Sequence, residues 1–211
     1  MNDQDNLSND RMQVHERGSS QTVSVWDWPV RLCHWLLVLA VAGLVITGQQ
    51  GGEAMEKHAL FGYTVLLIVI FRVVWGFWGS ATARFSHFLG SPATAWAYLR
   101  LSRDEKSRWI GHSPLAGYAV LLMLTLLIAQ ALTGLIADDE IAFTGPLAAS
   151  VPGAWSSWAT WYHKNVGKPA LLAMIALHLS AIAYYAIVLR IPLISAMVFG
   201  TREFQTRDIK K

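Results

Sequence analysis

Four histidines of this chain stand within apolar segments or at their ends. They are His34, His58, His163 and His178. An ionisable side chain inside a bilayer is costly, and such residues usually mark a functional site. A single histidine there more often makes a hydrogen bond between helices, but four of them favour a site that uses imidazole as a ligand. The remaining histidines lie in polar stretches and are expected to be solvated or interfacial: His15, His87 and His112.

The segments that carry these histidines are long enough to cross a membrane. The 211-residue chain is 54% apolar and only 15% charged, whereas soluble domains have about 25% charged residues. A transmembrane helix needs about 20 apolar residues. Segments near 30–48, 58–79, 115–136 and 166–190 qualify, and too little polar chain remains to cover them in water. The sequence predicts an all-α membrane protein built as a four-transmembrane-helix bundle.

The basic residues predict how the bundle is oriented. Three Lys and Arg lie in the tail up to Arg31, five lie in 84–108, and five lie from Arg190 onward. The connection 137–162 has none. Because cytoplasmic loops are enriched in Lys and Arg, both termini and the middle connection are expected to be cytoplasmic.

The polar ends of the chain are expected to lie outside the bundle. Residues 1–23 have almost nothing to pack and predict a disordered tail. Residues 24–203 form the predicted membrane domain, and 204–211 form a C-terminal tail. The stretch SPATAWAYLRL, 91–101, predicts a helix at the inner interface. A single cysteine, Cys33, excludes an internal disulfide and a CxxCH site for covalent haem.

This topology sorts the four histidines into two levels. His34 begins an outward helix and belongs to the inner half, whereas His58 begins an inward helix at the outer face. His163 opens the last helix, and His178 lies about 22 Å deeper at 1.5 Å per residue. His163 and His178 share one stripe of that helix, so the predicted pairs are His58 with His163 outside and His34 with His178 inside.

Two imidazoles from facing helices, at two levels, favour haem. Haem iron takes two axial ligands, and helix bundles hold such cofactors in their cores. Zinc usually takes four ligands, and no acidic or thiolate group completes a set here. Gly62 and Gly167 follow His58 and His163 at i+4, where a missing Cβ would let a flat macrocycle approach; close helix packing is the alternative explanation.

Haem propionates need cations near the membrane faces. Arg72 lies in the inner third of the second helix, where it could snorkel to the headgroups or neutralise an inner propionate. The other candidate cations share a position near a membrane face: Arg31 and Arg190 inside, and Lys57, Lys164 and Lys168 outside.

Several motifs resemble the bacterial cytochrome b561 family, which includes the di-haem cytochrome b subunits of nickel–iron hydrogenases. They are WDWPVRLCHW, KHALFGYTVLLIVIFRVVWGFWGS, GHSPLAGYAVLLMLTLLIAQALTGLIADDE and the last helix with its two histidines. The resemblance covers roughly residues 24–203. It implies a four-helix protein of the bacterial inner membrane with two haem b groups, passing electrons between quinone and a partner. The family's ligand histidines match His34, His58, His163 and His178.

One departure concerns the last helix. In the family its two histidines are usually one residue closer together than the fifteen residues that separate His163 from His178 here. Pro169 removes an intrahelical hydrogen bond and tends to kink the helix. A widened turn at this point could absorb the extra residue and keep both histidines on one stripe.

The leading interpretation is therefore an electron carrier of the respiratory chain, with bis-histidine haems exchanging electrons with membrane quinone and a periplasmic c-type cytochrome or hydrogenase-like subunit. The sequence leaves open whether the chain is an enzyme subunit, whether it forms a homodimer and where quinone binds. Gln130 and Thr133 are interpreted as helix–helix contacts. The alternatives are a haem-free membrane anchor of a redox complex, and a small transporter or metal-binding membrane protein. Nothing indicates a nucleic-acid partner.

Overall fold

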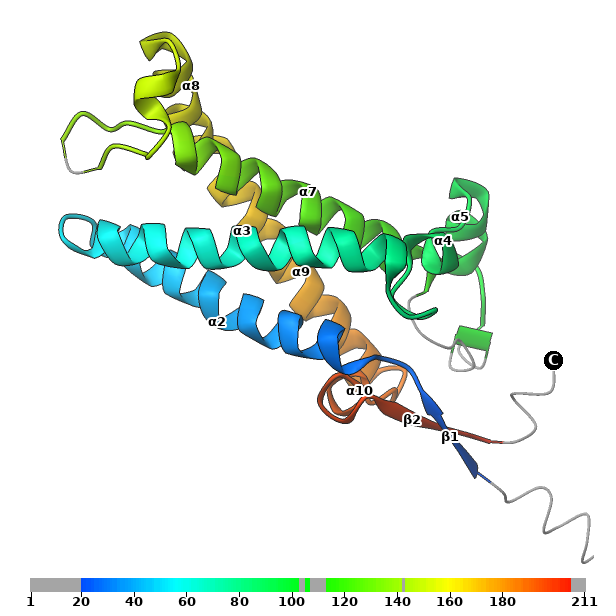
Figure 1. Ribbon diagram of the computed structural model, residues 1–211. Coiled ribbons are helices and arrows are strands. Elements are labelled where there is room, and N and C mark those ends of the chain that lie inside the picture. The colour runs from blue at the N-terminus through cyan, green and yellow to red at the C-terminus, as the bar shows by residue number, and fades with distance from the viewer. Residues whose placement is uncertain (1–19, 103–104, 107–112, 142, 206–211) are drawn as a thin grey trace, which may run out of the picture.

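Four long helical segments, which we call rods, form an elongated bundle in the computed structural model (Figure 1). The structure describes residues 20–102, 105–106, 113–141 and 143–205. Each rod is long and apolar enough to cross a membrane, as the sequence predicts. The first three are α2 (Trp28–Gln50), α3 (Ala54–Trp78) and α7 (Pro114–Ile136), and the fourth joins α8 (Gly153–Tyr162), the π-helix η2 (His163–Gly167) and α9 (Lys168–Ile187).

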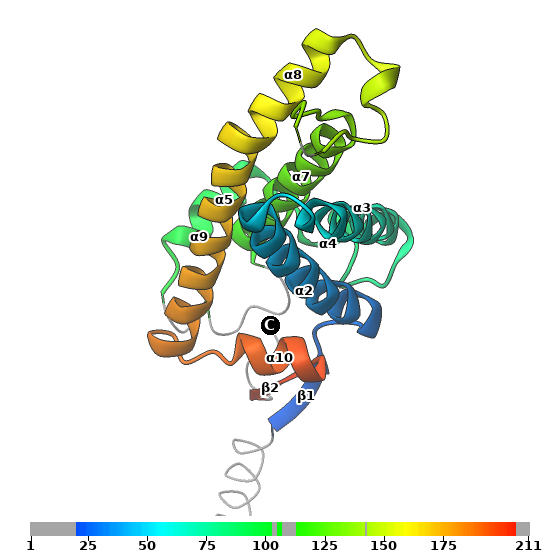
Figure 2. The ribbon, with the colours of Figure 1, turned by 90° about the vertical axis from the view of Figure 1, so that its left-hand side faces the viewer.

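The fourth rod is longer than predicted. It starts at Gly153 rather than near 166, because no proline and no further glycine occurs between Gly153 and Gly167. It ends at Ile187, since Arg190 has a positive φ of 55° and Pro192 follows. The rod runs along one side of the bundle, and α8 lies above α2 and α3 in the view of Figure 2.

Polar caps fix the starts of two rods. Asp27 Oδ1 accepts a hydrogen bond from the Val30 backbone N–H at 3.0 Å, and Ser113 Oγ accepts one from Ala116 N–H at 3.3 Å. Both caps precede a proline in the first helical turn. Asp27 Oδ2 also accepts from Trp75 Nε1 at 2.8 Å and from the Ser80 hydroxyl at 2.5 Å. The carboxylate thereby ties the start of α2 to the end of α3.

The bundle core is apolar and continuous. Ala40 of α2, Val65 and Val69 of α3, Leu124 and Leu127 of α7, and Leu171 of α9 are buried together. Large apolar side chains cover the outside; Leu39, Leu67 and Leu177 are more than 60% exposed. An apolar exterior is what a bilayer would cover.

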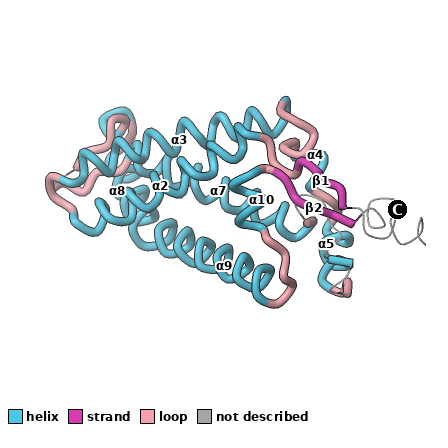
Figure 3. Tube along the Cα trace, turned by 90° about the horizontal axis from the view of Figure 1, so that it is seen from below, coloured by secondary structure: helices cyan, strands magenta, loops and turns pink. Residues whose placement is uncertain are grey.

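Short elements gather at the end of the bundle where the described chain begins and ends, at residues 20 and 205 (Figures 1 and 3). Strands β1 (Ser20–Ser24) and β2 (Thr201–Gln205) pair antiparallel. The described part of both predicted tails therefore contains a strand, because pairing satisfies the backbone groups and Phe204 is buried beside it. Residues 1–19 and 206–211 lie outside the described part. The helices at this end are α4 (Phe85–Phe88), α5 (Pro92–Leu99) and α10 (Leu193–Phe199), and α5 lies in the segment predicted to be an interfacial helix.

Candidate functional site

The structure brings the four intramembrane histidines together as two pairs. The ring centroids of His58 and His163 lie 6.3 Å apart, and those of His34 and His178 lie 6.4 Å apart. Two metal–imidazole bonds of about 2 Å each, plus the rings' own half-widths, span about 6 Å. Each pair therefore has room for one metal ion between its rings. We call His58 with His163 the loop-end pair, after the turn between α2 and α3, and His34 with His178 the terminus-end pair.

The loop-end pair is held by hydrogen bonds from two other helices. His58 Nδ1 lies 3.0 Å from the Leu44 carbonyl and 3.3 Å from Thr47 Oγ1, both on α2. His163 Nδ1 lies 3.2 Å from Thr133 Oγ1 on α7. In both rings the nitrogen that faces these groups is Nδ1, which leaves Nε2 for a ligand.

Two glycines make room for these rings. A Cβ on Gly48 would lie 3.0 Å from His58 Cε1, and a Cβ on Gly134 would lie 3.2 Å from His163 Cε1. Each glycine directly follows the threonine that contacts the same histidine. Sequence reasoning overlooked Thr47 and both glycines, and the repeated Thr-Gly dipeptide on the first and third helices was the available signal.

A cavity of about 420 Å³ opens beside the loop-end pair. Both histidines line it, together with mostly apolar residues of α2, α3 and α7. Gly62 also lines it, and a Cβ there would meet nothing within 4 Å. Lys164 and Lys168 reach the same cavity. The volume, the apolar lining, the open space at Gly62 and the two lysines fit a large planar cofactor with anionic groups.

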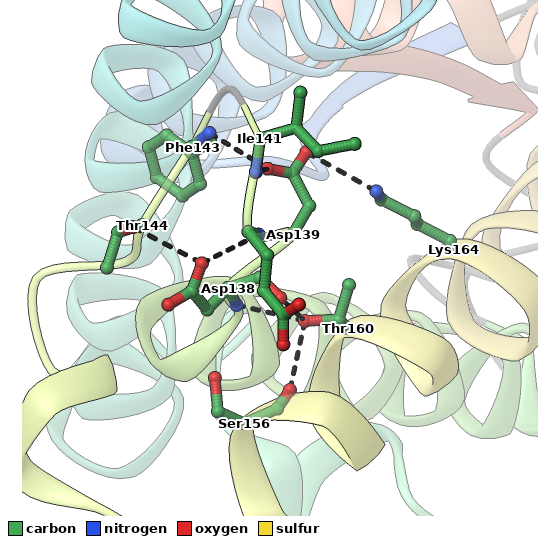
Figure 4. Close-up of polar contacts among 9 residues, drawn as sticks. Asp138, Asp139, Ile141, Phe143, Thr144, Ser156, Thr160 and Lys164 are labelled. Atoms are coloured by element: carbon green, nitrogen blue, oxygen red, sulfur yellow. Dashed lines mark hydrogen bonds and ion pairs between the residues drawn. The ribbon is translucent and has the colours of Figure 1, made fainter. Parts of the chain in front are cut away.

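The connection after α7 folds over this end of the bundle (Figure 4). Thr160 Oγ1 accepts from the Asp138 backbone N–H at 2.9 Å, and the Lys164 ammonium lies 3.5 Å from Asp139 Oδ2. The Phe143 backbone N–H donates to Asp139 Oδ1 at 2.9 Å. Asp139 and Phe143 line the cavity, so this connection forms part of its wall.

The π-helix accounts for the unusual spacing of the last helix. Its five residues, His163–Gly167, stand directly before Lys168 and Pro169. A widened turn near Pro169 was the predicted way to absorb the additional residue, and the structure confirms that turn. It keeps His163 and His178 directed at their respective partners. Gln130 Nε2 of α7 donates to the His163 carbonyl at 3.3 Å.

Gly167 does not face the cavity in the way that Gly62 does. A Cβ at Gly167 would overlap the Gln130 side-chain amide, so the glycine allows η2 to pack closely against α7. Of the two explanations considered for this glycine, the contacts match close helix packing. Gln130 and Thr133 do join α7 to the last rod, as expected, but Thr133 does so through a histidine ring.

The terminus-end pair has fewer polar neighbours. His34 Nδ1 is buried and has no hydrogen-bond partner among the described residues. His178 is exposed on α9. Arg72 is 6% exposed; one of its terminal nitrogens donates to the Ala83 carbonyl at 3.2 Å, and the other, Nη1, has no partner in the described part of the chain. Orphaned polar atoms such as these are uncommon in a buried position and indicate that a polar group belongs nearby.

The other candidate cations are divided between the two ends. Arg31 donates to the Val198 carbonyl of α10, which directs its guanidinium to the peripheral helices. Lys57 and Arg190 are exposed. Within the described residues, no three His, Cys, Asp or Glu side chains gather in a cluster that could hold a metal ion. Each pair therefore offers two protein ligands, which suits haem better than zinc.

The model of the prokaryotic cytochrome b561 family matches residues 25–200. The chain belongs to this family. Membership implies a membrane protein of electron transport that carries haem b.

Several curated relatives match over nearly the full chain, and these are named probable Ni/Fe-hydrogenase B-type cytochrome subunits. The protein of Rhizobium leguminosarum is 28% identical, covering 89% of this chain and 92% of the relative. That of Bradyrhizobium diazoefficiens is 27% identical over 87% of each chain, and that of Cupriavidus necator is 25% identical over 95% of each. No solved structure shows significant similarity to this chain.

Proposed function

We propose that this cytochrome carries electrons across the bacterial inner membrane through two haem b groups, one held by each histidine pair. The observation that carries the proposal is the pairing itself: two pairs at 6.3 and 6.4 Å between ring centroids. Fifteen residues separate His163 from His178, about 22 Å of helix, so the pairs together cover most of a hydrocarbon core about 30 Å thick.

At the loop end, His58 and His163 would each present Nε2 to the iron. The apolar cavity lining excludes water, and Gly62 lets a planar ring approach α3. Lys164 and Lys168 supply positive charge at the cavity wall for the propionates. Ligation by both His58 and His163 would leave this haem without a free position for oxygen.

At the terminus end, His34 and His178 take the equivalent role. Arg72 is buried in α3 with Nη1 unpartnered in the described residues, and it supplies the cation for a propionate. An anion at this position would satisfy the free guanidinium nitrogen.

Haem would supply reversible one-electron transfer, and the protein sets the spacing and the environment. The relatives' names suggest a nickel–iron hydrogenase as the partner, and membrane quinone would be the other exchange partner. The basic residues of the terminus end favour a cytoplasmic position for that end, which directs the loop end to the periplasm. A haem-free membrane anchor of such a complex is the alternative function.

Membranes that contain the protein test this proposal. We expect reduced-minus-oxidised spectra with b-type bands, and reduction of those bands by an added quinol. His58→Ala should halve the haem content, because one pair loses a ligand. His87→Ala should keep all of it, since His87 is exposed on α4. Spectra without b-type bands would support the haem-free anchor instead, and bands that the added quinol does not reduce would exclude quinone as the exchange partner.

A further inference from the structure

We propose that Thr47 and Thr133 are positioning residues that fix the tautomer of the loop-end histidines and lower the reduction potential of the haem bound there. The inference rests on the proposed function, because it concerns what surrounds the haem ligands. It goes further by assigning a role in tuning to two hydroxyl groups outside the ligand set.

Proton accounting fixes which atom donates at His58. Thr47 Oγ1 lies 2.6 Å from the Gly43 carbonyl, which can only accept, so the single hydroxyl proton is used there. Thr47 Oγ1 must then accept from His58 Nδ1. The Leu44 carbonyl, 3.0 Å from the same nitrogen, also requires a donor. Nδ1 therefore carries the proton, and Nε2 carries the lone pair that can bind a metal.

The same accounting applies at His163. Thr133 Oγ1 lies 2.7 Å from the Ala129 carbonyl and 3.1 Å from the Gln130 carbonyl. Its proton is again used on the backbone of its own helix. His163 Nδ1, 3.2 Å away, must donate to it. Both loop-end rings are thus fixed in the tautomer that leaves Nε2 free.

The two threonines form a repeated structural device. Each bonds back to the carbonyl four residues earlier, each contacts a histidine Nδ1 on a neighbouring rod, and each is followed by a glycine whose missing Cβ accommodates the ring. Thr47 on α2 supports His58 on α3, and Thr133 on α7 supports His163 on η2. We call each such threonine–glycine pair a socket, and each histidine of the loop-end pair has one.

A hydrogen bond from Nδ1–H changes the ligand strength of the ring. It increases electron density on the imidazole and raises its basicity as a ligand. A more basic axial ligand favours the oxidised iron, so the potential falls. The terminus-end pair has no equivalent: His34 Nδ1 has no partner among the described residues.

Redox titration of purified protein tests the inference. The titration is best made in His34→Ala protein, where only the loop-end haem is expected to remain and its potential is assigned without ambiguity. Thr47→Val and Thr133→Val keep the side-chain shape but remove the hydroxyl. We expect each to raise the midpoint potential, the double variant to raise it further, and the low-spin electron paramagnetic resonance signal to shift with it.

Matched controls exist on α3 and α7. Thr64 and Thr125 make the same backbone bond at 2.9 Å to the carbonyl four residues earlier, but neither contacts a histidine in the described structure. Thr125 is exposed, and Thr64 is half-buried. Thr64→Val and Thr125→Val should leave the potential unchanged. Thr47→Ser and Thr133→Ser retain the hydroxyl and should keep the potential close to that of the parent, which also covers the case of a valine variant that fails to fold.

The outcomes separate the two levels of the proposal. Parent protein without haem would refute the proposed function. If the parent protein binds haem but the valine and serine variants have the same potential and the same resonance signal, only the role of the hydroxyls is refuted. Equal shifts in the control variants would do the same, because they would show a general effect of removing a threonine.

Discussion

The two histidine pairs have almost the same ring separation but are supported in different ways. At the loop end, hydroxyl and carbonyl groups of α2 and α7 hold both rings directly. At the terminus end, His34 has a buried nitrogen without a partner among the described residues, and His178 is exposed. Hydrogen bonds from neighbouring groups orient the rings of the loop-end pair, whereas the positions of α2 and α9 determine where the rings of the terminus-end pair lie.

The position of α9 at the terminus end is set by peripheral elements. Tyr98 of α5 and Tyr185 of α9 share a hydrogen bond of 2.8 Å between their hydroxyls. Tyr185 stands seven residues after His178, so both lie on nearly the same face of α9. One fold can therefore position two histidine pairs of similar ring separation in two ways: by hydrogen bonds to the rings at the loop end, and by the packing of α9 at the terminus end.

Double variants are the strongest way to break this comparison. His58→Ala with His163→Ala removes two ligands of one pair, and we expect one haem to remain. His34→Ala with His58→Ala removes one ligand of each pair, and we expect almost no haem. The pyridine haemochrome assay measures the haem content of both double variants. Equal haem content in the two would contradict the pairing.

Substitution of Gly48 or Gly134, the glycines that make room for the loop-end rings, should affect only the loop-end pair. A Cβ at Gly134 or Gly48 would lie 3.2 or 3.0 Å from a histidine ring and displace it. Disturbing groups that orient a metal ligand costs about 10- to 100-fold in affinity. We expect Gly134→Ala and Gly48→Ala to lose the loop-end haem in detergent at a correspondingly higher rate. Gly153→Ala is the control, because a Cβ there meets nothing within 4 Å; equal loss from Gly153→Ala would exclude a local cause.

Tyr98→Phe should weaken the terminus end alone. Loss of the hydrogen bond to Tyr185 costs about 1 kcal/mol of unfolding free energy, and the terminus-end haem should dissociate faster. The effect carries a pH signature, since burial is the main cause that raises the pKa of Tyr98 above its ordinary value. The unfolded chain ionises at about pH 10, so this contribution persists at neutral pH and is lost as pH rises above 10. Thermal unfolding of wild type and variant across that range measures it, and a constant difference at every pH would contradict the assignment.

Deletion of Asn165 should have the smallest effect. It shortens the π-helix by one residue and restores the usual family spacing, and the Asn165 side chain is exposed. If the widened turn absorbs one residue, the deletion leaves both pairs aligned and the haem content unchanged. In a regular helix the same deletion would rotate His163 by about 100° relative to His178, and the loop-end haem would be lost.

Much of this arrangement could be predicted from the sequence. Apolar length predicts the four rods, and the helical period predicts that His163 and His178 share a stripe. The π-helix could be anticipated because the spacing differs from that of the family and Pro169 stands beside it. These features depend on local composition or on distances along one helix.

The remaining features depend on contacts between helices. Which ring Thr47 meets is decided by the register of α2 against α3, and no single helix contains that information. Gly167 could have faced a cofactor or a helix, and only the position of Gln130 distinguishes the two. The strand at Ser20–Ser24 forms because it meets residues 201–205, far away in the sequence.

The haem-to-chain ratio of purified wild-type protein, expressed with ample haem supply, tests the central claim most directly. Two histidine pairs predict two haem b groups per chain, both low-spin with two axial imidazoles. A ratio of one would remove one pair from the account, and colourless protein would contradict it entirely.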